Sequence, residues 1–223
     1  MAHLAGHASH RLRSLTLTRC TSITDAGFQT WAPARFPRLE RLVLADCTYL
    51  SDAAVVAVVA AAKQLTHLDL SFCCALSDTA TEVVALGLPR LRELRLAFCG
   101  SAVSDASLGS VALHLHGLER ISVRGCVRVT GAGVEDVLAG CGRLSWMDVS
   151  QCKNVEPWLR GGGVMRWGYD VREESAGEKE KAGYGYSDDD EPVPVAPMRS
   201  SPGRPRVRMP VRFVLEKGAG GLR

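Results

Sequence analysis

Six of the eight cysteines in this 223-residue sequence recur at an almost constant spacing, and a thiol can serve as a zinc ligand, half of a disulfide or a nucleophile. Zinc sites draw on closely spaced pairs such as CxxC, and the sequence contains none. Disulfide frameworks are typical of secreted chains, and the first residues, MAHLAGHASHRLRSL, hold no apolar stretch of signal-peptide length. The steady spacing instead predicts free structural thiols, one in each unit of a repeat. The six are Cys20, Cys47, Cys73, Cys99, Cys126 and Cys152, in steps of 26 or 27 residues.

Each of these cysteines ends the same phrase, LxxLxLxxC or a close variant, which predicts one short strand followed by one helix. An apolar residue follows three positions later, or four in the unit that reaches Val103, which therefore carries an insertion. Then comes Ser or Thr, which suits a helix N-cap, usually with Asp behind it, where it favours the positive end of the helix dipole. The phrases are LRSLTLTRC (12–20), LERLVLADC (39–47), LTHLDLSFC (65–73), LRELRLAFC (91–99), LERISVRGC (118–126) and LSWMDVSQC (144–152).

A fixed period of 20–50 residues indicates a solenoid. The pattern LxxLxLxxCxxLTDxxL, with a period near 26, resembles the cysteine-containing leucine-rich repeats over residues 1–158. We therefore predict an α/β leucine-rich-repeat solenoid, a horseshoe with a parallel concave sheet and outer helices. The resemblance extends to the substrate-binding half of F-box proteins and to antagonist-of-mitotic-exit-type proteins. It implies a protein-protein interaction module that recognises substrates for a cullin-type (SCF) ubiquitin ligase, and no enzymatic activity.

The sequence divides into a repeat array, a linker and a terminal strand. We expect about six repeats in residues 1–158, truncated at the N-terminus and without an F-box in this chain, because MAHLAGHASHRLRSL resembles the last turns of an incomplete unit. Residues 159–208 are expected to be a disordered linker, acidic and then basic. Within 209–223, the segment MPVRFVL alternates well enough to form a capping strand on the open edge of the sheet.

The expected binding surface is the concave face. No GxSxG, HExxH or Gly-rich phosphate loop occurs, and neither a cofactor nor a metal is implied. The residues between the leucines point outward, because side chains alternate along a strand. Aromatic residues and arginines dominate interface energetics, which favours the middle and C-terminal repeats. The predicted protein-binding residues are His67, Asp69, Phe72, Glu93, Arg95, Phe98, Arg120, Arg124, Trp146 and Asp148.

The tail leaves other functions open. Ser187 precedes four acidic residues and suits an acid-directed kinase, and Ser201 precedes a proline, so both are phosphorylation candidates. PGRPR (202–206) resembles the core of a DNA minor-groove hook, which supports a nucleic-acid-associated function, although a net charge of +3 argues neither way. A further alternative is a stand-alone adaptor or competitive inhibitor without ligase recruitment. We expect a cytoplasmic and/or nuclear protein that binds a protein substrate or regulator on its concave face, and a ligase adaptor only if an F-box is supplied elsewhere. We do not expect DNA or a membrane as a partner.

Two residue groups have simpler interpretations. His3, His7 and His10 have helical spacing and are expected to be surface side chains instead of metal ligands. Cys74 is the expected exposed thiol, and Cys141 is expected to pack in the core.

Overall fold

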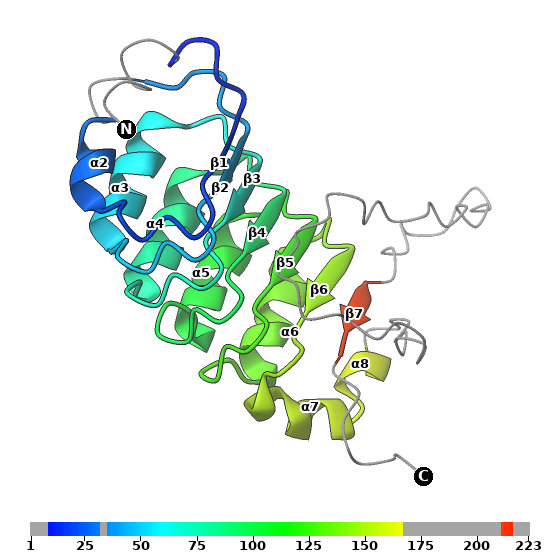
Figure 1. Cartoon of the computed structure of the whole chain (residues 1–223). Helices are drawn as coiled ribbons and strands as arrows, with labels where there is room; N and C mark the ends of the chain where they lie inside the picture. Colours follow the sequence, from blue (N-terminus) through cyan, green and yellow to red (C-terminus); the bar gives the residue numbers. More distant parts are fainter. Residues whose placement is uncertain (1–8, 32–34, 167–210, 216–223) are drawn as a thin grey trace, which may run out of the picture.

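Short strands alternate with helices along the chain (Figure 1). The structure is a computed structural model that describes residues 9–31, 35–166 and 211–215. The repeat elements are β1 (Ser14–Thr16), α2 (Asp25–Gln29), β2 (Arg41–Val43), α3 (Asp52–Ala61), β3 (His67–Asp69), α4 (Asp78–Gly87), β4 (Glu93–Arg95), α5 (Asp105–His114), β5 (Arg120–Ser122), α6 (Gly131–Gly140) and β6 (Trp146–Asp148). The last elements are the 3-10 helix η1 (Lys153–Val155), α7 (Glu156–Arg160), α8 (Gly163–Arg166) and β7 (Arg212–Val214).

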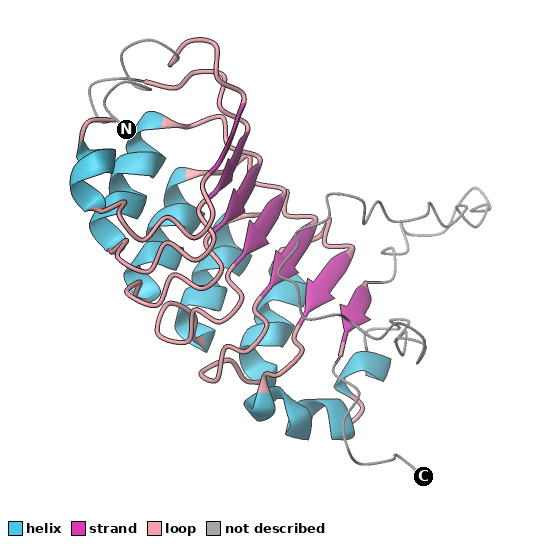
Figure 2. Ribbon diagram, viewed as in Figure 1, coloured by secondary structure: helices cyan, strands magenta, loops and turns pink. Residues whose placement is uncertain are grey.

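The described strands form one parallel sheet in the order β1 to β7, and the helices lie along one face of this sheet (Figure 2). Each strand is three residues long, and its central side chain points into the core because side chains alternate across a strand. These central residues are Leu15, Leu42, Leu68, Leu94, Ile121, Met147 and Phe213, of which all but Leu15 are buried. The predicted fold class, a leucine-rich-repeat solenoid, is confirmed.

The helices begin where the Ser/Thr–Asp pairs predicted. The Ser51, Ser77 and Thr130 hydroxyls each accept a hydrogen bond from a first-turn backbone N–H of their own helix, whereas Thr24 forms no such bond. The aspartates in the first turn of the helices also form hydrogen bonds to the next repeat. Asp25 accepts from the backbone N–H and hydroxyl of Ser51 in the next repeat, at 2.9 and 2.5 Å.

The same contact joins Asp52 to Ser77 and Asp105 to Thr130. We call this series the aspartate ladder. It links the start of α2 to that of α3, α3 to α4, and α5 to α6, so at these positions it sets the spacing of the repeats as well as the helix boundaries.

The C-terminal end differs from the sequence-based division. Residues 159–166, predicted as linker, form the end of α7, a two-residue turn and α8, because Trp158 packs onto the end of the array and holds them there. Its ring lies 6.2 Å from that of Phe213, and its Nε1 donates to Glu135 at 2.8 Å. Strand β7 pairs with β6 in parallel. The remaining linker residues, 167–208, and residues 209–210 and 216–223 lie outside the described residues.

Candidate functional site

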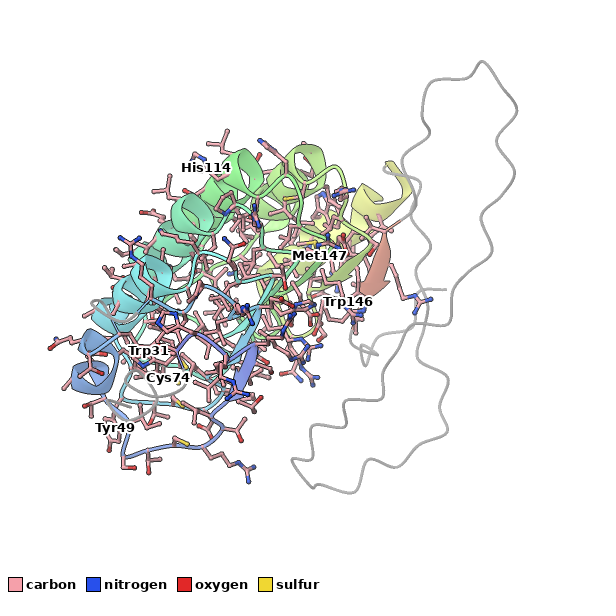
Figure 3. The ribbon with its side chains drawn as sticks, turned by 90° about the horizontal axis from the view of Figure 1, so that it is seen from above. Trp31, Tyr49, Cys74, His114, Trp146 and Met147 are labelled. Carbon is pink, nitrogen blue, oxygen red and sulfur yellow. The ribbon has the colours of Figure 1, made fainter. Side chains whose placement is uncertain are left out.

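The strand register aligns the concave side chains into two columns. The first column runs Ser14, Arg41, His67, Glu93, Arg120, Trp146 and Arg212, and the second runs Thr16, Val43, Asp69, Arg95, Ser122, Asp148 and Val214. Trp146 and Met147 show the alternation in Figure 3, with Met147 directed toward the helices and Trp146 on the concave side. The predicted residues on the strands therefore lie next to one another, as the repeat register predicted.

A charged cluster occupies the middle of the concave face. Glu93 accepts from the Arg95 guanidinium at 2.6 Å, and its other oxygen lies 3.9 Å from His67 Nε2. Burial lowers the pKa of His67, and the Glu93 carboxylate opposes that shift while Arg41 reinforces it. The imidazole is therefore neutral near pH 7 and can exchange hydrogen bonds with a partner, as it already does with Thr66 Oγ1 at 2.8 Å.

Two predicted binding residues are buried instead of presented. Asp69 and Asp148 are 6% and 7% exposed. Asp69 accepts from the backbone N–H of Ser71 at 2.9 Å. Asp148 accepts from the N–H and hydroxyl of Ser150 and from the Ser122 hydroxyl. A short carboxylate satisfies the backbone two residues on in this way, so both side chains hold the strand ends in place.

The predicted residues Phe72 and Phe98 form a stack at the ends of β3 and β4. Their ring centroids are 4.8 Å apart with an interplanar angle of 20°, and both side chains are partly exposed. The Arg124 guanidinium lies 5.7 Å from the Phe98 ring centroid. Gly125 provides the space for this arrangement, because a Cβ there would lie 2.5 Å from a Phe98 ring carbon. We call Phe72, Phe98 and Arg124 the aromatic patch.

Sequence reasoning missed the backbone conformation of the aromatic patch. Phe72 and Phe98 have φ of 62° and 57°, a region in which a bulky side chain is a genuine outlier. Two backbone hydrogen bonds impose it. The Phe98 N–H donates to Arg124 O of the next repeat at 2.7 Å, and the Cys99 N–H closes a turn onto Leu96 O of the same repeat at 3.3 Å. The one available signal was Gly125, which stands in the same column and has φ of 68°.

A second aromatic contact lies toward the C-terminal end. The Arg120 guanidinium carbon is 4.8 Å from the Trp146 ring centroid. Arg120 Nε is buried and has no hydrogen-bond partner among the described residues. The pair places a guanidinium beside an amphipathic ring on the concave face, and both residue types are enriched among interface anchors.

The hydrogen bonds of the repeated cysteines give them a structural role. Each interior thiol donates to a backbone carbonyl of the preceding repeat, as Cys99 does to Leu70 O at 3.0 Å and Cys152 to Val123 O at 3.0 Å. Burial raises the pKa of both thiols, to about 12 for Cys99 and about 11 for Cys152. A protonated, buried thiol is a hydrogen-bond donor and a poor nucleophile. The column members are Cys20, Cys47, Cys73, Cys99, Cys126 and Cys152, all free thiols, of which Cys20 alone is partly exposed.

The remaining expectations concern metals, membranes and modifications. Within residues 9–31, 35–166 and 211–215, no group of three or more His, Cys, Asp or Glu side chains is placed to hold a metal. No helix of this part of the chain is long and apolar enough to cross a membrane. Cys74 is exposed and Cys141 is buried. His3, His7, Ser187 and Ser201 lie outside the described residues.

Comparisons with known proteins agree with this geometry. A family model described as "Leucine Rich repeat" matches residues 63–82. Among solved structures, the chain is similar to one in the crystal structure of the Rad7 and Elc1 complex in yeast, with 19% identity and a TM-score of 0.57. That match covers 69% of this chain but only 40% of the other. The tropomodulin C-terminal domain of Caenorhabditis elegans is 13% identical, with a TM-score of 0.49 and coverage of 73% and 96%. The fold is that of a leucine-rich-repeat solenoid, and such solenoids use their extended concave surfaces for binding.

Proposed function

We propose that this chain is a protein-recognition module whose partner binds across the aromatic patch and the adjoining concave residues. The observation that carries the proposal is the pair of phenylalanines held at positive φ. Such a conformation costs a non-glycine residue about 1 kcal/mol or more, and it persists where the surrounding structure over-determines it. Glycine at these positions would remove the strain, as Gly125 does one repeat later. Retaining two stacked, partly exposed rings there favours a binding function for them.

The rest of the concave face supplies complementary chemistry. Beside the aromatic patch lies the cluster of His67, Glu93 and Arg95. The Arg120–Trp146 pair follows on the next two strands, with Arg120 next to Glu93. An interface of this composition has apolar anchors flanked by charged groups that select the partner. A protein segment with an exposed apolar or aromatic side chain for the patch is the partner chemistry that fits best.

In its finer form, the proposal is substrate recognition for a cullin-type (SCF) ubiquitin ligase, the function implied by the resemblance of the repeats to those of F-box proteins. An F-box or a second protein would have to supply the link to the ligase adaptor. The structure of Rad7 with Elc1, in which two proteins form a complex, supports the coarser idea that an array of this fold works in an assembly. The stand-alone adaptor or inhibitor remains the alternative.

Affinity capture from the source cell tests the proposal with a matched pair of variants. The test variant is Phe72→Gly with Phe98→Gly, and the control is Asp46→Gly with Gln151→Gly, at the same column and also at positive φ. Both relax the same backbone strain, but only the first removes the rings. A partner that is lost from the test variant and kept by the control supports the patch. Identical captures from the two variants contradict it.

The composition of the capture separates the finer functions. A cullin adaptor that co-purifies with the wild-type chain supports the ligase assignment. A partner without an adaptor supports the stand-alone module. Binding to DNA that disappears with Arg204→Ala and Arg206→Ala would instead support the nucleic-acid alternative, which depends on residues outside the described part of the chain.

A further inference from the structure

The two edges of the solenoid carry opposite charge. The loops that lead into β1–β6 (residues 9–13, 35–40, 62–66, 88–92, 115–119 and 141–145) contain eight Arg and Lys against two Glu, a formal excess of six positive charges. All eight basic residues are exposed. The loops that lead from the strands into the helices, with the first helical residue, contain three Arg against five Asp. We call the eight the basic edge: Arg11, Arg13, Arg35, Arg38, Lys63, Arg90, Arg92 and Arg143.

The helix dipole does not account for the basic edge. Basic residues complement a helix when they lie in its last turn. The last turns of α3, α4 and α6 contain none, and α5 has only His114. The basic side chains instead lie in the loops beyond the helices. Lys63 donates to Gly87 O at the end of α4, and Arg13 and Arg92 pair with Glu40 and Glu119, but two glutamates do not balance eight exposed basic residues.

Part of the basic edge surrounds a hollow of about 390 Å³. Its lining includes Arg13, Arg38 and Arg90, from three different loops. Arg13 pairs with Glu40 at 3.1 Å, and Arg90 donates to the neutral Gln64 amide. Arg38 forms no ion pair with the described residues. Three guanidinium groups around one carboxylate leave a net positive site that suits several carboxylates or a phosphate.

The chain itself contains a matching acidic segment. Residues 170–191 hold nine acidic and three basic residues, a formal charge of −6 that equals the excess on the basic edge in size. The segment between α8 and β7 returns to this same edge, because the Arg212 N–H donates to Ser145 O at 2.9 Å and Ser145 lies in the loop 141–145. Glu191 precedes Val211 by 20 residues, which extend to about 65 Å. Strand β3 is four strand spacings from β7, or about 19 Å, so the hollow is within reach.

We propose that residues 170–191 of this chain dock on its own basic edge, with the acidic run Asp188–Glu191 at the arginine-lined hollow. The contact is electrostatic and weakens with salt. It places the segment along the loops beside the concave face, and it does not depend on the function proposed for the aromatic patch. A phosphate on Ser187 adds negative charge beside the acidic run and strengthens the docking.

The lysines of the chain make the proposal testable on the intact protein. A zero-length carbodiimide reagent joins a carboxylate to a lysine only when the two are in contact. Lys63 lies on the basic edge, Lys153 lies beyond β6 on the opposite edge, and Lys217 lies in the basic C-terminal residues 199–223, the rival site for the acidic segment. A mixture of isotopically light and heavy protein separates links within one chain from links between chains. We expect links from Asp188–Glu191 to Lys63, within one chain and in low salt.

Two variants identify the cause of these links. Arg38→Glu with Arg90→Glu reverses two charges of the hollow and keeps Lys63 in place. The matched control, Arg19→Glu with Arg160→Glu, reverses two exposed charges elsewhere. Circular dichroism checks that both fold. Links to Lys63 that fall to background in the first variant and in 1 M salt, where the Debye length is about 3 Å, and persist in the control, support the proposal.

Several results would overturn it. One is a link pattern dominated by Lys217 or Lys153. Another is a Lys63 link that survives the charge reversal or 1 M salt. A third is the absence of any link to Lys63 in low salt. The salt titration of the wild-type chain needs no variant, so the test holds even if the charge reversal disturbs folding.

Discussion

The Arg128 guanidinium binds the Asp78 carboxylate across two repeats, with Nη1 2.8 Å from Oδ2. The same nitrogen donates to Ser101 O at 3.0 Å. Asp78 holds the equivalent position at the start of α4 but is not part of the aspartate ladder, because it does not bind the next N-cap. The inserted residue ahead of Ser104 shifts that serine, which bonds with Ser107 instead. Arg128 therefore replaces the missing ladder contact and ties the loop with the insertion to its neighbours.

Removing Arg128 should destabilise the array more than an ordinary surface charge does. Asp78 Oδ1 is buried and already has no hydrogen-bond partner, so Arg128→Ala would leave both carboxylate oxygens without a cation. We expect the free energy of unfolding to fall by about 1–2 kcal/mol, measured by urea denaturation. Arg160→Ala, which breaks an exposed pair with Glu156, should change it by less than about 0.5 kcal/mol. If Arg128→Ala and Arg160→Ala lowered the free energy of unfolding equally, the Arg128–Asp78 contact would contribute no more than an exposed ion pair.

The positive φ of Phe98 reverses the usual order of alanine and glycine. Ala normally stabilises a chain relative to Gly, because Gly has more conformational freedom to lose. At φ of 57° Ala remains strained and Gly does not. Phe98→Gly should therefore be more stable than Phe98→Ala by about 1 kcal/mol, in thermal or urea unfolding. Gln151→Gly, with φ of 60° and no stacked ring, should gain about as much over Gln151→Ala. If the Ala variants were more stable than the Gly variants at both positions, the backbone there would not be strained.

The periodic features of the fold were predictable from the sequence. The LxxLxL phrase located the strands, because a side-chain alternation of two residues fixes which of them enter the core, and Leu68 and Leu94 are buried as predicted. The Ser–Asp pairs located the helix starts. The concave columns followed from the repeat length alone, since residues 26 or 27 apart must lie on neighbouring strands.

What the sequence did not predict depends on contacts between repeats. The segments DLS (69–71) and DVS (148–150) are local signals for an aspartate whose carboxylate accepts a hydrogen bond from the residue two positions later. Both segments also fit the alternating strand pattern, which predicts an outward-pointing aspartate instead. The Arg128–Asp78 contact arises because the insertion removes another contact, and no local pattern encodes such a replacement. Helices α7 and α8 depend on Trp158, which contacts Glu135 of α6 and Phe213 of β7, residues far from it in the sequence.

The buried thiols make stability fall at high pH. Below pH 9.0, the ordinary pKa of a thiol, both the folded and the unfolded chain keep the Cys99 proton. Above it the unfolded chain releases the proton, while burial holds the folded pKa at about 12, so unfolding becomes more favourable as the pH rises between these values. Each such thiol contributes a slope of about −1.4 kcal/mol per pH unit.

A single substitution isolates this effect. Urea unfolding at pH 8 to 10.5 should show a steeper loss of stability for the wild-type chain than for Cys99→Ala, by about 1.4 kcal/mol per unit above pH 9. Cys74→Ala is the control, because it removes an exposed thiol and leaves the buried cysteine column intact. Parallel curves for the wild type and Cys99→Ala would mean that Cys99 ionises in the folded state.

The fifth repeat has Gly131 where the four before it have Asp, and the end of the array explains it. No further N-cap follows for an aspartate to bind, and Trp158 packs over the helix start instead. A Cβ on Gly131 would lie 2.2 Å from Trp158 Cβ, which is too close for any side chain.

Gly131→Ala should therefore displace Trp158 and cost about 1–3 kcal/mol of unfolding free energy, although Ala favours a helix over Gly. A red shift of the tryptophan fluorescence should accompany the loss, as the indole becomes hydrated. Gly142→Ala, whose Cβ would meet nothing within 4 Å, should leave both readouts unchanged. If Gly131→Ala were as stable as the wild type, the packing of Trp158 over the start of α6 would not stabilise the end of the array.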